Sequence, residues 1–346
     1  MFDKMFDVVT FGSATMDIFV ESDKAHVVNI RGVEGELDLY CLKYGEKIEI
    51  DHSAFEVGGG AINTAACFGR LGLKTAAAIK IGEGVDRKDA KKKLKEFNIE
   101  SDFVMKTDED RTGFSVILTS FEGDRTVLAH RGANITLKKE DINWDKLKKT
   151  KWIYSAPLNS KYGCVLEYIT DFAAEHGIKV FANLGGKALE RSIEELTPIL
   201  KNVNIVSLNT QEATKITGIE QKYRETKAII NDDVKEMMKI FKNIVKDIVI
   251  ITDGSKGAYA YDGNKFYYAP IYPTKRVSSL GAGDAFASTF CAATIMGYDI
   301  LTALEFASIN SGHVVTCFNA QDGLLHYDKL KELQKENTEY KAMIVD

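Results

Sequence analysis

The stretch "VSSLGAGDAFASTF" (277–290) places two glycines and an aspartate directly before an apolar, alanine-rich run that predicts a helix. Glycines let backbone N–H groups converge on an anion, and the helix N-terminus adds a partial positive charge. An aspartate held beside them can accept a proton. Gly281, Ala282, Gly283 and Asp284 therefore suit phosphoryl transfer, in which positioning and charge stabilisation do most of the catalysis. A glycine turn with an aspartate in the first helical turn is the structural alternative.

Other polar residues also follow short apolar runs. Leu158 and Asn159 follow "WIYSAP", Asn183 ends "KVFAN", Asn209 ends "NIVSLN", and Thr252 ends "DIVIIT". Ligands of open parallel sheets bind outside the carboxyl ends of the strands. Each junction alone is explained by a turn or a helix cap. Their repetition at successive junctions indicates a binding site.

Two familiar nucleotide-binding signatures are missing from the sequence. It contains no GxxxxGK[ST], which excludes a P-loop, and the first apolar run is followed by "GSATMD" rather than GxGxxG. A dinucleotide-binding dehydrogenase is therefore disfavoured.

Four motifs, in order and spacing, resemble the ribokinase (PfkB) family of carbohydrate kinases over nearly the full chain. They are "GGGAINTAACFGRLG" (58–72), "NTQE" (209–212), "TDGSKG" (252–257) and "SSLGAGDAF" (278–286). The resemblance implies an ATP-dependent enzyme, working with Mg²⁺, that phosphorylates a hydroxyl group of a small sugar or sugar-like molecule.

The resemblance also implies roles for residues on the acceptor side. Asp284 would be the base that takes the proton of the acceptor hydroxyl, and the backbone of Gly281, Ala282 and Gly283 would form the anion hole. Asp17 in "FGSATMD" would bind substrate hydroxyls, with Gly58, Gly59 and Asn63 beside it.

On the nucleotide side, Asn209 and Glu212 would organise Mg²⁺, and Thr252, Gly254 and Gly257 would line the nucleotide. Asn310 in "ASINSGHVV" would approach the adenine end. Asn209 and Glu212 also have the spacing of a helix capping box. A buried polar helix residue is the simpler account of Asn310.

The chain departs from the family immediately before GAGD. Relatives activated by a monovalent cation have an Asp and a Thr there, whereas this chain has Ser278, Ser279 and Leu280. The missing carboxylate removes a charged ligand or an organiser of the loop, which argues against activation by K⁺.

These residues require a scaffold of parallel strands and crossover helices. Apolar runs at 7–11, 75–81, 152–157, 179–183, 204–209 and 247–252 are continuous, as in strands covered on both faces. Helical patterns separate several of them; in "VLEYITDFAAEHG", Val165, Ile169 and Ala173 share a face, and Gly177 can end the helix. The prediction is an α/β, ribokinase-like three-layer fold, whose central, mostly parallel sheet is flanked by helices.

Two segments interrupt this alternation, at about 19–55 and 112–131. The second reads as a β-hairpin turning at Glu122, Gly123 and Asp124. Together they predict a small antiparallel β lid on a single domain spanning 1–346. The lid would cover the sugar and exclude water, and its exposed edge would suit a homodimer.

Composition limits the remaining possibilities. Forty-five basic and fifty acidic side chains give a net charge of −5, which argues against a nucleic-acid partner. No apolar run is long enough to span a membrane, and the five cysteines form no CxxC pair, so we expect a reduced, cytoplasmic protein. A nucleoside kinase of the same family and a non-catalytic sugar or nucleotide sensor remain as alternatives.

Overall fold

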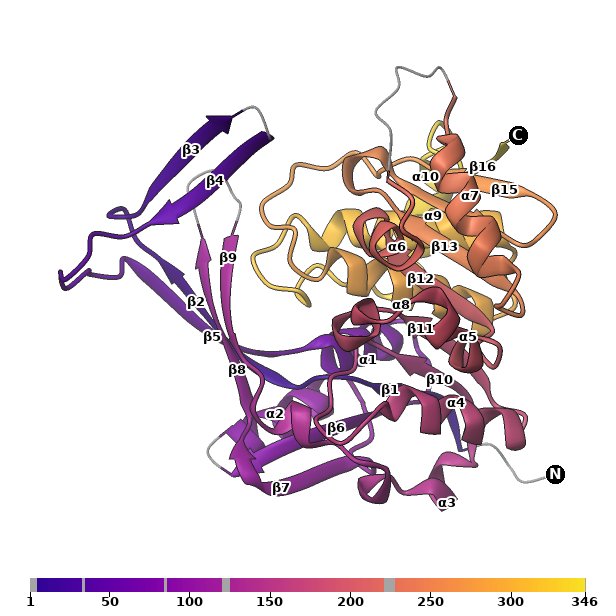
Figure 1. The fold of residues 1–346 in the computed structure, drawn as a ribbon, viewed down its shortest axis with the longest axis horizontal. Helices are drawn as coiled ribbons and strands as arrows, with labels where there is room; N and C mark the ends of the chain where they lie inside the picture. Colours follow the sequence, from indigo (N-terminus) through magenta and orange to yellow (C-terminus); the bar gives the residue numbers. More distant parts are fainter. Residues whose placement is uncertain (1–4, 33–34, 84–85, 120–124, 221–227, 346) are drawn as a thin grey trace.

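The six continuous apolar runs form neighbouring strands of one ten-stranded sheet, as predicted (Figure 1). In this computed structural model, residues 5–32, 35–83, 86–119, 125–220 and 228–345 are described. The strands, in spatial order, are β16 (Met343–Val345), β15 (Phe266–Ala269), β14 (Ala258–Tyr261), β13 (Ile248–Thr252), β12 (Ile205–Asn209), β11 (Lys179–Asn183), β10 (Thr150–Ser155), β1 (Phe6–Phe11), β6 (Thr75–Glu83) and β7 (Val104–Arg111). All pairs from β13 to β7 are parallel, and those from β13 to β16 are antiparallel.

Helices cover both faces of this sheet, which explains why its strands are apolar throughout. One core contains residues of α1 (Gly60–Arg70), α2 (Asp86–Glu96), α8 (Ala282–Ile295), α9 (Ile300–Val314) and α10 (Tyr327–Glu336). The other contains residues of α3 (Trp144–Leu147), α4 (Val165–Glu175), α5 (Ile193–Leu200), α6 (Thr210–Thr217) and α7 (Asp232–Lys242). Successive residues of β10 alternate between the cores, with Tyr154 in the first and Ile153 in the second. The predicted three-layer α/β fold is confirmed.

The predicted helix after "WIYSAP" is α4. Val165, Ile169 and Ala173 are buried on one face, and the chain leaves the helix at His176 and Gly177, whose φ is +63°. This left-handed conformation suits glycine and lets the chain turn into β11.

A smaller sheet projects beside the large one, at the segments predicted to form a lid, and we call it the lid sheet, or the lid (Figure 1). Its strands, in spatial order, are β5 (His52–Gly58), β2 (Thr15–Glu21), β8 (Gly113–Thr119) and β9 (Arg125–His130). The predicted β8–β9 hairpin is present; its proposed turn residues Glu122, Gly123 and Asp124 lie outside the described residues. Two pairs are antiparallel, but β2 and β8 at the centre are parallel.

A separate hairpin, β3 (His26–Gly32) with β4 (Gly35–Cys41), extends from the lid and stands apart from the helices of the main sheet (Figure 1). The lid strands begin at Thr15, earlier than the predicted residue 19, because β2 follows β1 after only a short connection. Among the residues that the structure describes, no helix is both long and apolar enough to cross a membrane.

Candidate active site

A cavity of about 340 Å³ lies between the lid and the carboxyl ends of β1 and β10. Four predicted residues line it: Asp17, Gly59, Asn63 and Asp284. They come from four different places along the chain, so the fold brings together what the motifs identified separately. Asn159, one of the polar residues that follow an apolar run, also lines the cavity. Sequence analysis did not single out several further polar residues on its wall, namely Ser13, Thr15, Ser115, His130 and Asn134.

Asp284 lies in the first turn of α8, where its carboxylate faces the cavity. Asn63 Nδ2 donates a hydrogen bond to its Oδ2 over 3.0 Å. Burial raises the pKa of Asp284 to about 6, although the Asn63 hydrogen bond lowers it and the charge of Asp17 raises it further. A carboxylate whose pKa lies close to neutral pH is well suited to accept a proton from a substrate.

The N-terminus of α8 is open toward the substrate side. Gly281 is the N-cap, with φ +76°, and supplies no side-chain cap; a Cβ at this position would collide with Ala320. A Cβ at Gly283 would meet nothing within 4 Å, so space lies beside the helix terminus. The first N–H groups of a helix have no partner within it. The terminus thus has the backbone N–H groups that the predicted anion hole would use, although Ala282 N already donates to Ser279 O over 3.4 Å.

Asp17 lies in β2 on the opposite wall. Thr15 Oγ1 donates to its Oδ1 over 2.9 Å. Burial raises the pKa of Asp17, the hydrogen bonds of Thr15 and Ser115 lower it, and Glu56 raises it. Gly58 packs so closely that a Cβ there would collide with Asp17 Oδ2, so a larger residue would displace this carboxylate.

The connection after β9 completes the wall. Asn134, in the 3₁₀ turn η1 (Gly132–Thr136), accepts from Ala14 N and donates to Ala14 O, each over 2.9 Å. It therefore fixes the link between β1 and β2. The predicted lid segment ends at about residue 131, just before Asn134, so sequence analysis did not single this residue out.

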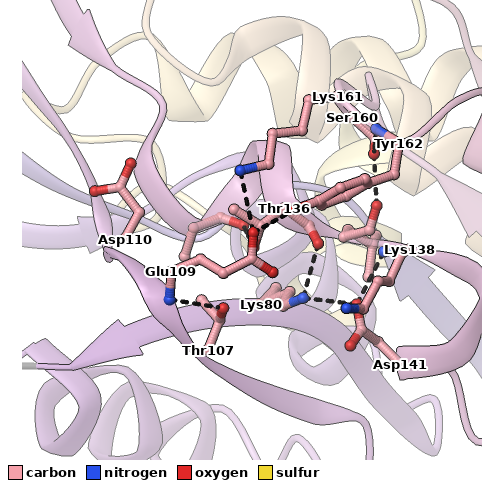
Figure 2. A network of polar contacts seen from close by, with 12 residues as sticks. Lys80, Thr107, Glu109, Asp110, Thr136, Lys138, Asp141, Ser160, Lys161 and Tyr162 are labelled. Atoms are coloured by element: carbon pink, nitrogen blue, oxygen red, sulfur yellow. Dashed lines mark hydrogen bonds and ion pairs between the residues drawn. The ribbon is translucent and has the colours of Figure 1, made fainter.

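A network of polar contacts joins this connection to strands β6 and β7 (Figure 2). Lys80, 2% exposed at the centre of β6, donates to Thr136 O and Asp141 Oδ2, each over 2.7 Å. Further along, Lys161 pairs with Glu109 over 3.1 Å, and the Tyr162 hydroxyl donates to the same carboxylate. These contacts fix the chain between η1 and α4 against β6 and β7.

The residues that are predicted to bind the nucleotide lie at the carboxyl ends of β12 and β13. Asn209 and Thr252 are register partners there. Gly254 and Gly257 follow with φ of +53° and +98°, around the 3₁₀ turn η4 (Gly254–Lys256). These residues occupy the same edge of the sheet as Asp284 but are not part of the 340 Å³ cavity.

Asn209 and Glu212 form the capping box that was the structural alternative. Asn209 N donates to Glu212 Oε2 and Glu212 N donates to Asn209 Oδ1, both over 2.8 Å. Burial raises the pKa of Glu212, and only the hydrogen bond from Asn209 opposes this. The second carboxylate oxygen, Oε1, lies by Gly185, which also packs against Pro157 of the cavity wall. In the box Glu212 uses Oε2 as the acceptor, while Oε1 lies on the side of Gly185.

The described residues contain no cluster of three or more His, Cys, Asp or Glu side chains that could hold a metal alone. A partly buried carboxylate such as Glu212 fits Mg²⁺ bound chiefly through phosphate oxygens and water. The residues present are thus compatible with a magnesium–nucleotide complex.

The prediction for Asn310 is wrong. Its side chain is fully buried in α9, where Nδ2 donates to Thr289 Oγ1 over 2.8 Å and Oδ1 accepts from Leu325 N over 2.9 Å. Both polar ends are used inside the core, so the carboxamide has no surface left for adenine. The simpler alternative, a buried polar helix residue, describes it.

Of the three residues before GAGD, Leu280 lines the cavity. Its N–H donates to Ser278 Oγ over 3.2 Å. Serines stand at positions 278 and 279, where relatives activated by a monovalent cation have the Asp and the Thr.

Comparison with known proteins agrees with this geometry. The family model "pfkB family carbohydrate kinase" matches residues 5–326. The chain belongs to the pfkB family of carbohydrate kinases. It is therefore an ATP-dependent sugar kinase, and kinases of this family generally use a divalent metal with ATP.

Individual relatives are distant. The chain is 25% identical over 291 residues to a 5-dehydro-2-deoxygluconokinase of Geobacillus thermodenitrificans, covering 80% of this chain and 83% of the relative. It is 27% identical over 285 residues to a bifunctional ribokinase/ribose-5-phosphate isomerase A of Fructilactobacillus sanfranciscensis, covering 81% of this chain but only half of that protein. The structure of Arabidopsis thaliana ribokinase complexed with ribose and ATP superposes with a TM-score of 0.78 at 22% identity, covering 95% of this chain and 99% of that one.

Proposed function

We propose that this kinase transfers the γ-phosphoryl group of ATP to a hydroxyl or hydroxymethyl group of a small sugar or sugar acid bound between Asp17 and Asp284. One observation carries the proposal: the Asp284 carboxylate stands at a free helix N-terminus, in the same cavity as Asp17 and Asn63. Such an arrangement orients an acceptor hydroxyl and stabilises the anion that approaches it.

In this mechanism Asp284 accepts the hydrogen bond of the attacking hydroxyl and later its proton. A hydroxyl is far less acidic than a carboxylic acid, so the proton moves late and Asp284 first acts by orienting the nucleophile. The N–H groups of Gly281, Ala282 and Gly283 stabilise the charge of the transferred group. Asp17, Gly58, Gly59 and Asn63 bind the other hydroxyls of the sugar, and the lid excludes water as a competing acceptor.

On the donor side, Asn209, Thr252, Gly254 and Gly257 hold the nucleotide. Glu212 would bind Mg²⁺ through its waters, and the metal supplies charge neutralisation at the phosphates. Ser278, Ser279 and Leu280 support independence from K⁺, because none of them offers a carboxylate.

A nucleoside kinase is the nearest alternative. A nucleobase needs an aromatic or flat apolar slot beside the ribose. Among the described residues of the cavity wall, His130 is the one aromatic ring, and it packs against Phe114 at 5.1 Å. The other apolar members are small or aliphatic, such as Ile117, Val127 and Ala129. This wall favours a sugar without a base.

The test is turnover with ATP and Mg²⁺ against a panel of ribose, fructose, keto-deoxy sugar acids and nucleosides, with and without K⁺. We expect a sugar or sugar acid to be phosphorylated, with equal rates in both salts. Asp284→Asn should bind nucleotide normally but lose turnover by about 10²- to 10⁴-fold. Unchanged turnover would remove Asp284 from the mechanism, and tight sugar binding without transfer by the unmodified protein would favour a sensor.

We further propose that the chain acts as one catalytic unit whose lid also pairs two copies. Hairpin β3–β4 supports this, because Val28 and Ile30 share one face with their cross-strand partners Leu39 and Leu37, and all four are exposed. A cytoplasmic location is supported by the use of ATP and by five free cysteines.

A further inference from the structure

Residues 318–323, between α9 and α10, lie behind the catalytic groups without belonging to any of the motifs. Within this segment Gln321 is only 4% exposed. Its Nε2 donates two hydrogen bonds, to Val57 O over 2.8 Å and to Asn63 Oδ1 over 2.9 Å. Val57 is in lid strand β5, and Asn63 is the residue whose Nδ2 donates to Asp284. One buried amide therefore contacts both the lid and the partner of Asp284.

These contacts have a defined direction. Val57 O is a backbone carbonyl and can only accept, so the end of Gln321 that faces it must be the NH₂ group. The same NH₂ group meets Asn63 Oδ1, which leaves Asn63 Nδ2 to face Asp284. Turning either carboxamide around would bring two acceptors together. Gln321 Oε1 has no hydrogen-bond partner among the described residues, so no contact of this oxygen favours the opposite orientation of the Gln321 carboxamide.

The segment has three further contacts that hold it in place. Asn319 Oδ1 accepts from the N–H groups of Gln321 and Asp322 over 3.0 and 2.9 Å. Ala320 packs against the N-cap Gly281, and the ring of Phe318 lies 5.6 Å from that of Phe19 in lid strand β2. The segment thus touches the lid twice and the catalytic groups twice.

We propose that Gln321 is a positioning residue for phosphoryl transfer: it fixes the carboxamide of Asn63 so that Nδ2 holds the Asp284 carboxylate, and it ties this arrangement to lid strand β5. The inference rests on the proposed role of Asp284. Without Gln321, the Asn63 carboxamide is free to turn, and the hydrogen bond that favours the ionised form of Asp284 weakens.

Several ionisable groups surround Asp284 and bear on the test. From α1 and β10, Cys67 and Tyr154 stay protonated, because burial raises the pKa of Cys67 to about 11 and that of Tyr154 well above its usual value. Across the cavity are Asp17 of β2 and, around the end of β9, His130 and Arg131. From α8 and the 318–323 segment come Cys291, whose pKa burial also raises, and Asp322, which accepts from Asn319. The side-chain amide of Gln321 donates its two hydrogen bonds to Val57 O and Asn63 Oδ1 and to none of these groups, so its replacement acts on Asp284 through Asn63.

The decisive variant is Gln321→Met, which keeps the length of the side chain and removes both donors. Its readout is the pH titration of the Asp284 carboxyl carbon by ¹³C NMR, assigned with Asp284→Asn. We expect the titration to move up by about one pH unit, the size of a weakened hydrogen bond to a charged group. The kcat/KM for the sugar should then fall about fivefold at pH 6 and little at pH 8.

A double-mutant cycle separates positioning from general destabilisation. In an Asn63→Ala background, adding Gln321→Met should shift neither the titration nor kcat/KM further. Gln334→Met is the matched control, because it makes the same substitution in α10. It removes the hydrogen bond that Gln334 Nε2 donates to Glu305 Oε2 over 2.6 Å. It should leave the Asp284 titration unchanged.

Two results would overturn the proposal: an unchanged Asp284 titration in a folded Gln321→Met protein, or an equal shift with and without Asn63. If the Met variant does not fold, Gln321→Asn provides the same test, because the shorter amide cannot reach both acceptors. The carboxyl titration needs no substrate. The titration therefore remains a valid test even if the proposed sugar acceptor is wrong. The turnover of Asp284→Asn tests separately whether Asp284 acts in phosphoryl transfer.

Discussion

Asp284 combines a burial that favours its neutral form with a function that needs its ionised form. The folded protein raises its pKa from 3.8 to about 6, chiefly through burial. Between these values the folded state holds a proton that the unfolded chain has lost, so the contribution of Asp284 to stability falls as pH rises through this range. Above about pH 6 the full cost of burying the charge is present, and the ionised Asp284 carboxylate destabilises the folded protein.

Replacing Asp284 with Asn should therefore stabilise the protein near neutral pH. We expect the free energy of unfolding at pH 7 to rise by an amount on the order of 2 kcal/mol, with the gain disappearing as pH falls toward 4. Urea unfolding at several pH values measures it. Asp322→Asn, at an exposed carboxylate in a nearby turn, is the control. A gain that stays constant with pH would show that ionisation is not its cause.

At this scale the sequence predicts the residues that belong to contiguous motifs. Asp284, Asn63 and Asp17 each have a local pattern, and the cavity contains all three. Gln321 has none, because its importance comes from an amide contact with Asn63 across 258 positions of sequence. Asn310 was misassigned for the opposite reason: its helix matched the family pattern, but neighbours distant in sequence use both its polar ends.

At the scale of elements, continuous apolar runs predict the parallel strands well, since both faces of the sheet are covered. The parallel pairing of β2 with β8 was missed, because register between distant segments leaves no local trace. Lys80 is similar. It interrupts the apolar run "TAAAIKI", and its partner Asp141 lies 61 positions away, so the sequence gives no sign that the two form a buried ion pair.

Removing one member of that pair should weaken the wall of the active site. Lys80→Met removes the charged donor of Asp141, which keeps the hydrogen bond from Lys138 N, and it also removes the Lys80 hydrogen bond to Thr136 O. We therefore expect a loss of about 2 to 4 kcal/mol in unfolding free energy. The KM for the sugar should rise as well, because η1 carries Asn134. Urea unfolding and steady-state kinetics measure the two effects.

Lys148→Met supplies the comparison, since Lys148 pairs with Asp145 on the surface and its loss should cost less than about 0.5 kcal/mol. The double variant Lys80→Met/Asp141→Leu should recover part of the stability, as both buried charges are then gone. A loss below 1 kcal/mol for Lys80→Met would contradict a structural role for the pair.

At the scale of the whole molecule, the question is what covers the apolar face of hairpin β3–β4. A two-stranded hairpin is marginally stable alone, and this one presents Val28, Ile30, Leu37 and Leu39 on one side, exposed by 38 to 55%. Its other side carries polar residues beside Val27 and Tyr40, with Asn29 Nδ2 donating to Asp38 Oδ1 over 2.6 Å. An amphipathic hairpin that stands clear of the main sheet suits a symmetric contact between two copies (Figure 1).

We therefore expect the protein to sediment as a dimer and the double variant Val28→Asp/Leu39→Asp to sediment as a monomer with an unchanged circular dichroism spectrum. The substitutions introduce charges at positions that are exposed within one copy, so they should disturb association rather than folding. Ile271→Asp is the control, because that side chain is 51% exposed but lies outside the lid. It should leave the dimer intact. Two results would contradict this dimer: an unmodified protein that sediments as a monomer, or a double variant that remains dimeric. The apolar face of the hairpin would then have another function, and closure of the hairpin over the sugar would be the next hypothesis to test.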